Sequence, residues 1–129
     1  MRVSPADIVA RAKATITECT VSKAQQCLDG SILLIDIREA PEYQRGHIPG
    51  AILLPRGLLE FEIHRLVDGT STESGTAPED REIILYCGTG GRSALAAETL
   101  STMGYRNVQS MSGGIVAWAA KQLPIDLPR

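Results

Sequence analysis

The residues best suited to chemistry stand together in the segment Cys87-Gly88-Thr89-Gly90-Gly91-Arg92-Ser93. Cys87 directly follows the apolar run 83–86, which predicts a buried strand, and open α/β sheets bind ligands at the carboxyl ends of their strands. The three glycines let successive backbone amides turn inward and form an anion-binding nest, and the helix predicted after the segment adds its positive end. Arg92 adds a permanent cation.

These features predict an activated cysteine. A thiolate beside helix amides and an arginine has a lowered pKa and attacks more readily at neutral pH, so no neighbouring general base is needed. The same nest would stabilise a terminal persulfide or an incoming anion. Alternatively, Cys87 is a small buried hydrophobe and the glycines only form a tight turn. Because strand end, glycines, Arg92 and helix start coincide, we favour an exposed, activated thiol.

The remaining residues of the segment are candidates for substrate binding: Gly88, Thr89, Gly90, Gly91, Arg92 and Ser93. Thr89 and Ser93 would hydrogen-bond the sulfur or cap the following helix, and for Ser93 we favour the cap because a serine there satisfies an unpaired amide. Asp36 and Arg38 lie just past the predicted strand 32–36 and could orient the cysteine loop or supply a second cation. For this pair we favour a structural ion pair.

The histidines and the tryptophan fit structural roles better than catalytic ones. We expect His47 to shape the loop 46–50, since no second ligand nearby suggests a metal, and His64 to lie on an exposed helix face. Trp118 has helical spacing from Ile115 and is expected in the core. The sequence therefore predicts neither a metal nor a cofactor.

Two further thiols and one apolar helix segment have alternative interpretations. Cys19 and Cys27 lack a glycine nest and a close arginine, so we expect packing rather than a resolving thiol that accepts sulfur. The apolar residues in 58–63 could form a dimer patch, although burial against the sheet is commoner.

Composition narrows the class of protein. The chain has 129 residues, 43% of them hydrophobic and 22% charged, which suits one folded domain rather than a disordered chain. A net charge of −2 and 4% aromatic residues argue against binding nucleic acid or an anionic membrane. Three cysteines make a poor disulfide framework, and neither an apolar leader nor a run of about 20 apolar residues is present, so we expect a cytoplasmic protein.

Apolar periodicity and turn residues predict alternating helices and strands. The predicted helices cover 5–15, 22–28, 40–44, 58–66, a segment from 94 to Gly104, and 115–122; the strands cover 16–19, 32–36, 51–55, 83–86 and 108–111. Residues 68–80 are poor in apolar side chains and predict a mobile surface loop. This alternation indicates an α/β sheet with helices on both faces.

Three ordered blocks resemble the rhodanese family of sulfurtransferases. The cysteine loop lies between a first block (34–39, 42–43 and 46–51) and a last block (112–118 and 123–125). The resemblance implies a central, mainly parallel five-stranded sheet with helices on both faces. We expect a single rhodanese domain over 1–129, with 1–30 as a helical extension and first strand and 31–126 carrying the blocks.

The resemblance also implies a ping-pong reaction. A donor such as thiosulfate leaves a sulfur on Cys87, and the persulfide passes to cyanide or a thiol. The spacing Cys-x4-Arg is similar to that of sulfurtransferases, whereas related phosphatases carry one residue more, so it favours sulfur transfer over phosphate hydrolysis or arsenate reduction. A catalytically silent binding module on the same fold usually lacks the cysteine.

One departure from the family concerns the donor. Many relatives carry Arg or Lys where this chain has Gly88, so the loop holds one cation and thiosulfate should bind less tightly, by about 1 kcal/mol. We therefore expect modest thiosulfate activity and partners that are a small-molecule sulfur donor and acceptor or a protein persulfide. We expect no nucleic acid or membrane partner, and a monomer or homodimer.

Overall fold

The sheet at the centre of the molecule is built from short parallel strands. A computed structural model describes residues 1–70 and 75–128. Within these residues the sheet has five strands in the order β1-β5-β4-β2-β3, and every pairing is parallel. The strands are β1 (Thr17–Cys19), β2 (Leu33–Asp36), β3 (Ile52–Leu53), β4 (Ile83–Tyr86) and β5 (Val108–Met111). The predicted central sheet of five parallel strands is confirmed.

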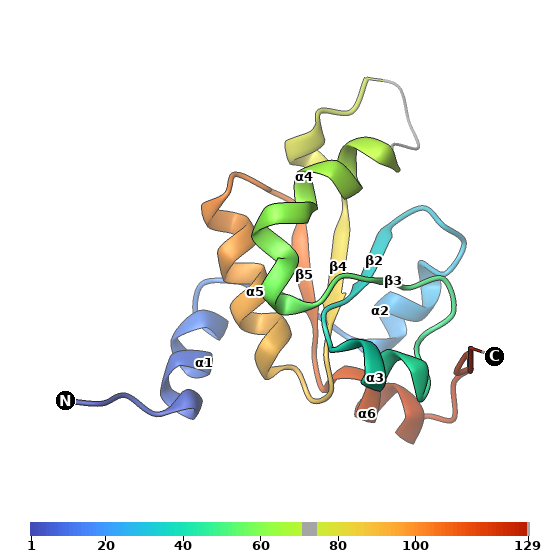
Figure 1. The fold of residues 1–129 in the computed structure, drawn as a ribbon, viewed down its shortest axis with the longest axis horizontal. Helices are drawn as coiled ribbons and strands as arrows, with labels where there is room; N and C mark the ends of the chain where they lie inside the picture. The colour runs from blue at the N-terminus through green and yellow to red at the C-terminus, as the bar shows by residue number, and fades with distance from the viewer. Residues whose placement is uncertain (71–74, 129) are drawn as a thin grey trace.

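Helices connect the strands and cover both faces of the sheet (Figure 1). α1, α4 and α5 lie on one face, and α2 and α6 on the other, with α3 beside the lower edge in this view. Their bounds are α1 (Pro5–Lys13), α2 (Val21–Gln26), α3 (Ala40–Gln44), α4 (Leu59–Gly69), α5 (Gly91–Thr102) and α6 (Gly114–Ala120), with short 3₁₀ turns at Arg56–Leu58 and Pro78–Asp80.

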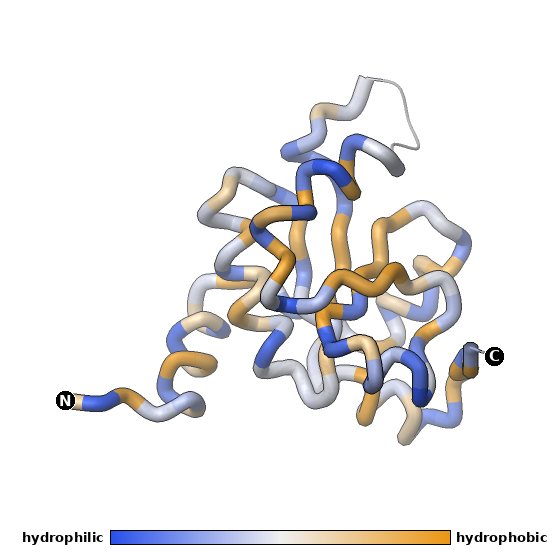
Figure 2. The backbone as a smooth tube through the Cα atoms, viewed as in Figure 1, coloured by the Kyte–Doolittle hydropathy of each residue, from blue (hydrophilic) through white to orange (hydrophobic). Residues whose placement is uncertain are grey.

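Alternation along the strands divides the core into two layers. In β4, Ile83 and Leu85 pack towards α4 and α5, whereas Ile84 and Tyr86 pack in the cluster that contains Trp118. All four residues of β2 and all four of β4 are buried, as expected for central strands of a parallel sheet. In Figure 2 the backbone of these central strands is coloured mostly as hydrophobic residues.

The N-terminal segment packs on the helix that follows the cysteine loop. Ser4 caps α1 by accepting a hydrogen bond from the Asp7 amide at 3.1 Å, and Pro5 occupies the first turn. A Cβ at Gly91, the first residue of α5, would lie 3.6 Å from Val9 Cγ2. The helix predicted for residues 5–15 therefore lies beside the start of α5.

Some predicted boundaries shift. Thr20, not Ser22, caps the second helix, because its hydroxyl accepts from the Lys23 amide at 3.1 Å. α4 runs to Gly69, so the predicted loop 68–80 begins inside a helix and ends in a 3₁₀ turn; its residues 71–74 lie outside the described residues. In the part of the chain that is described, no helix is both long and apolar enough to span a membrane.

Candidate functional site

Cys87 lies at the carboxyl end of β4, but its side chain is buried rather than exposed. Only 1% of the residue is accessible. The expectation of an exposed thiol is therefore wrong in this respect. The physical reason is local, because the loop after β4 and the first turn of α5 place the Gly90 and Ser93 amides against the sulfur.

Hydrogen-bond donors surround the sulfur. The Gly90 amide lies 3.1 Å from Cys87 Sγ and the Ser93 amide 3.4 Å from it. The Ser93 hydroxyl lies 3.5 Å from the same sulfur and 2.8 Å from the hydroxyl of Ser110, a residue of β5. Ser93 and Ser110 are both fully buried. The site thus holds a line of two hydroxyls that ends at the sulfur.

These contacts decide the ionisation of the thiol. Burial raises the pKa of Cys87, but hydrogen bonds from the Ser93 side chain and from the amides of Ser93, Gly90 and Thr89 lower it, and the net pKa falls below the usual cysteine value. A buried sulfur with a lowered pKa is suited to be a nucleophile, not merely a packing thiol.

Ser93 does not cap the helix, contrary to the interpretation we favoured. α5 begins at Gly91, and Gly90 is its N-cap residue, with a positive φ of 106°. This left-handed conformation is accessible to glycine at little cost. Ser93 therefore falls inside the first turn, where its amide and hydroxyl both face the sulfur. The alternative role, a hydrogen bond to the sulfur, is the one that the structure shows.

The N-terminus of α6 holds the backbone of the cysteine loop through hydrogen bonds to its carbonyl groups. The Ile115 amide donates to the Cys87 carbonyl at 2.9 Å, and the Val116 amide donates to the Gly88 carbonyl at 3.1 Å. Gly114 has a φ of +59°, and a Cβ on it would collide with the backbone of Gly88. Because these carbonyls are turned towards α6, the amides that follow can turn towards the sulfur. Nothing in the sequence pattern of the last block predicts this role.

Arg92 lies at the mouth of the loop, where a carboxylate holds it. Its guanidinium donates two hydrogen bonds to Glu42 of α3, at 2.9 and 3.0 Å. The hydrogen bonds from Arg92 lower the pKa of Glu42 to about 2, and Glu42 in turn raises the pKa of Arg92. A Cβ at Gly88 would lie 3.3 Å from Arg92 Nη2, so the guanidinium extends over the loop. Sequence reasoning missed Glu42, because its partner is 50 residues away.

Asp36 and Arg38 form a buried ion pair instead of facing the sulfur. Arg38 Nη2 lies 2.8 Å from Asp36 Oδ2 and also donates to the Gly46 carbonyl at 2.8 Å. Arg38 is 7% exposed and Asp36 is fully buried. The guanidinium lies over the Tyr86 ring, 5.8 Å from its centroid. These contacts fit the structural role that we favoured, in which the pair joins β2 to the loop 46–50.

The histidines and Trp118 hold structural positions. The His47 ring stacks on Tyr43 with centroids 3.7 Å apart, and His47 pairs with Asp126 in an isolated antiparallel bridge. His64 is exposed on α4, as predicted, and its Nδ1 lies 2.6 Å from the Tyr105 hydroxyl. Trp118 is fully buried, as predicted, and donates to the Pro124 carbonyl at 2.8 Å.

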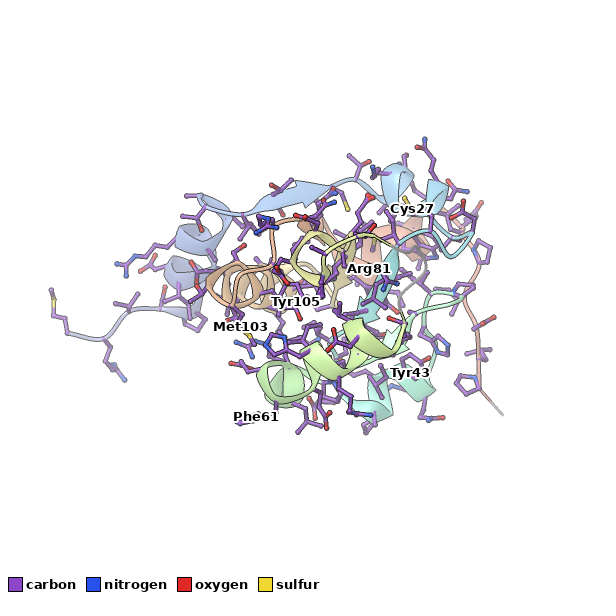
Figure 3. The ribbon with its side chains drawn as sticks, turned by 90° about the horizontal axis from the view of Figure 1, so that it is seen from above. Cys27, Tyr43, Phe61, Arg81, Met103 and Tyr105 are labelled. Carbon is purple, nitrogen blue, oxygen red and sulfur yellow. The ribbon has the colours of Figure 1, made fainter. Side chains whose placement is uncertain are left out.

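The other two thiols and the apolar segment of α4 lie outside the loop. Cys19 is buried in the core layer of Trp118, and burial raises its pKa to about 11; Cys27 packs against the same layer. Of the apolar residues in 58–63, Leu59 and Ile63 are buried, whereas Leu58 and Phe61 are exposed. Figure 3 shows Phe61 and Cys27 on opposite sides of the molecule.

Comparison with known proteins identifies the fold family. The model of the rhodanese-like domain family matches residues 20–121. The chain belongs to the rhodanese-like domain family. The cysteine loop, α3 and the start of α6 all lie within the matched range, so the rhodanese-like domain includes every residue of the candidate site described above.

Relatives of this rhodanese-like chain carry different functional descriptions. A sulfurtransferase of Allochromatium vinosum is 37% identical over 97 residues, covering 75% of this chain and 80% of that protein. A solved structure from Rhodopseudomonas palustris, of unknown function and described as a possible tyrosine phosphatase, has 30% identity and a TM-score of 0.79, covering 98% and 96% of the two chains. The polysulfide-sulfur transferase homodimer of Wolinella succinogenes has 26% identity and a TM-score of 0.70, covering 93% and 85%.

Proposed function

We propose that the protein is a sulfurtransferase that carries a sulfane sulfur on Cys87. Rhodanese-like membership and the similarity to a named sulfurtransferase support sulfur transfer in general. The observation that carries the proposal is the set of groups around one sulfur: the Gly90 and Ser93 amides donate to Cys87 Sγ, and the Ser93 hydroxyl, which accepts from the thiol at 3.5 Å, can donate once the thiol is ionised. They stabilise negative charge on the thiolate and on the terminal sulfur of a persulfide.

The atoms and electrons of the proposed sulfur transfer balance without an oxidant or a metal. The Cys87 thiolate attacks the outer sulfur of a thiosulfate ion, a new S–S bond forms, and the original S–S bond breaks to release sulfite with its electron pair. An acceptor thiolate or cyanide then attacks the terminal sulfur of the Cys87 persulfide and regenerates the thiolate. Gly88, Thr89, Gly90, Gly91, Arg92 and Ser93 are the proposed binding loop, with Asp36 and Arg38 as structural support.

Mass spectrometry of the intact protein tests this function. After incubation with thiosulfate, the wild-type protein should gain the mass of one sulfur atom, and addition of cyanide should remove it. Cys87→Ser should gain none, whereas the matched control Cys27→Ser should behave as the wild type. A wild-type chain that gains no sulfur from thiosulfate, from a thiosulfonate or from a thiol persulfide would contradict the proposal.

A second class of activity deserves a direct assay because of one neighbour. The Rhodopseudomonas palustris structure is described as a possible tyrosine phosphatase. The Cys-x4-Arg spacing of this chain favours a sulfur atom over a phosphate ester. We therefore expect no release of phosphate from an aryl phosphate by a protein sample that accepts sulfur on Cys87.

We also propose a cellular compartment and a class of partner for the protein. Cys19, Cys27 and Cys87 are free thiols, which suits a reducing compartment such as the cytoplasm. The donor and acceptor would be small molecules or a protein persulfide, and the chain would act as a monomer or homodimer without nucleic acid or membrane.

A further inference from the structure

The charge at the mouth of the cysteine loop is balanced by a residue outside the loop. Arg92 is the basic residue of the segment 87–93, and Glu42 takes two of its hydrogen bonds. The side chains of Glu42 and Arg92 are 28% and 44% exposed, so the pair borders the solvent from which a donor arrives. A donor therefore meets a neutral pair or must compete with Glu42 for the guanidinium.

Gly88 leaves room for this arrangement. Arg92 Nη2 lies 3.3 Å from the position that a Cβ at residue 88 would occupy, so a side chain there would make the flexible end of Arg92 shift slightly. Glu42 is itself held in place, because it accepts a hydrogen bond from the Glu39 amide at 3.1 Å in the capping box of α3. The carboxylate is thus built into the site from a second element.

We propose that Glu42 determines the specificity of the site for the charge of the sulfur donor. It favours singly charged donors, such as persulfides and thiosulfonates, over the thiosulfate dianion. This inference rests on the proposed function of Cys87. Glu42 acts through Arg92 and through direct repulsion of the donor. The Coulomb energy between a carboxylate and a donor scales with the charge of the donor, so Glu42 disfavours a dianion about twice as strongly, in free energy, as a monoanion.

A matched pair of donors tests this. Methanethiosulfonate carries the same transferable sulfur as thiosulfate but one negative charge fewer. Glu42→Gln keeps an oxygen for the Glu39 amide and removes the charge. If it lowers KM for methanethiosulfonate by about threefold, KM for thiosulfate should fall by about the square of that factor, roughly tenfold, with kcat for both donors nearly unchanged.

The control is Glu62→Gln, which removes an equal charge from an ion pair with Arg65 on α4. It should leave both KM values unchanged. A Glu42→Gln protein whose ratio of the two KM values equals that of the wild type would overturn the inference while leaving sulfur transfer intact. A wild-type protein that takes sulfur from neither donor would instead overturn the proposed function and the inference together.

A second measurement needs only the wild-type chain. If the Glu42–Arg92 pair leaves the entrance to the cysteine loop without net charge, KM for thiosulfate should change little with ionic strength, because there is no net attraction for salt to screen. A KM that rises steeply with salt in the wild type would show that the entrance to the loop carries a net positive charge. That result would overturn the inference even if Glu42→Gln failed to fold.

Discussion

The thiol of Cys87 is buried and has a lowered pKa, two properties that usually oppose each other. Burial disfavours the thiolate, yet the pKa of Cys87 is lowered because amides and a hydroxyl replace the lost water. Since the Ser93 hydroxyl also contacts Ser110 at 2.8 Å, it can donate to the thiolate while Ser110 donates to it. Ionisation at this residue therefore depends on buried neutral donors in addition to the nearby cation.

Ser93→Ala should raise the pKa of Cys87, since it removes the side-chain hydrogen bond to the thiolate. The thiolate form is then lost at a higher pH, so persulfide formation should fall at neutral pH and recover as the pH rises. The titration is followed by thiolate absorbance, with Cys87→Ser as the blank. Ser101→Ala, an exposed position on the same helix, should leave the curve unchanged. An unshifted curve in Ser93→Ala would contradict this assignment.

Gly88→Arg should lower KM for thiosulfate about fivefold, corresponding to about 1 kcal/mol for one charge-assisted contact. The substitution is sterically tolerable, since the nearest atom to a new Cβ is the flexible end of Arg92 at 3.3 Å. Gly88→Ala is the control, because it adds the Cβ without the charge. A KM equal to that of the wild type in Gly88→Arg would show that a second cation is irrelevant to the donor.

The start of α6 is the element that gives the cysteine loop its shape. Two of its amides hold the carbonyls of Cys87 and Gly88, and Gly114 allows the two backbones to meet. α5 contributes its first turn to the sulfur, and α3 contributes Glu42 to Arg92. The reactive sulfur therefore lies directly after β4, α5 and α6 shape its loop, and α3 holds Arg92.

Gly114→Ala should both destabilise the protein and abolish sulfur loading. A Cβ there collides with the backbone of Gly88, so α6 or the loop must move. Gly104→Ala is the matched control, because Gly104 also has a positive φ, +104°, but nothing lies within 4 Å of its Cβ position. We expect a loss of roughly 1–2 kcal/mol in the control, from backbone strain alone, and at least about 2 kcal/mol more in Gly114→Ala, measured by urea unfolding.

Equal free energies of unfolding in the two variants would contradict this account. So would a Gly114→Ala protein that loads sulfur at the wild-type rate, because the loop would then keep its shape without the close contact to α6.

At the scale of the whole molecule, the parallel sheet brings distant segments to one edge. The carboxyl ends of β2, β4 and β5 lead into the ion pair Asp36–Arg38, the cysteine loop and the start of α6. The candidate site is therefore made from Glu42, residues 87–93, Ser110 and residues 114–116, although its chemistry centres on one cysteine.

The sequence predicted the sheet, because central parallel strands such as 83–86 are short apolar runs, and the predicted strands 83–86 and 108–111 match β4 and β5 residue by residue. It predicted the cysteine loop, because glycines and a cation beside a thiol leave a local pattern. It missed Glu42 and Ser110, whose partners are distant in the chain. It also misjudged Ser93 and the exposure of Cys87, since the first turn of α5 begins three residues earlier than a cap at Ser93 would require.

The ion pair between Glu42 and Arg92 should also contribute to acid stability. The pKa of Glu42 is lowered to about 2, below the value near 4.3 expected in the unfolded chain, so the contribution is present above that higher value and is lost as the pH falls towards 2. Glu42→Gln should therefore be less stable than the wild type at neutral pH, by at most about 1 kcal/mol because solvent screens the pair, and should match it near pH 2. Urea unfolding across this range measures the difference, and one that stays constant with pH would contradict this origin.

The hydrogen bonds from α6 to the carbonyls of Cys87 and Gly88 also limit how this domain could be re-engineered or diversify. An insertion that widened the loop for a larger oxyanion would displace the Gly88 carbonyl from the Val116 amide and leave that amide without its partner. A change of substrate class would thus require compensating changes in the loop and in α6 at once. A single-residue insertion in the loop alone should give a destabilised protein rather than an enzyme with a new substrate.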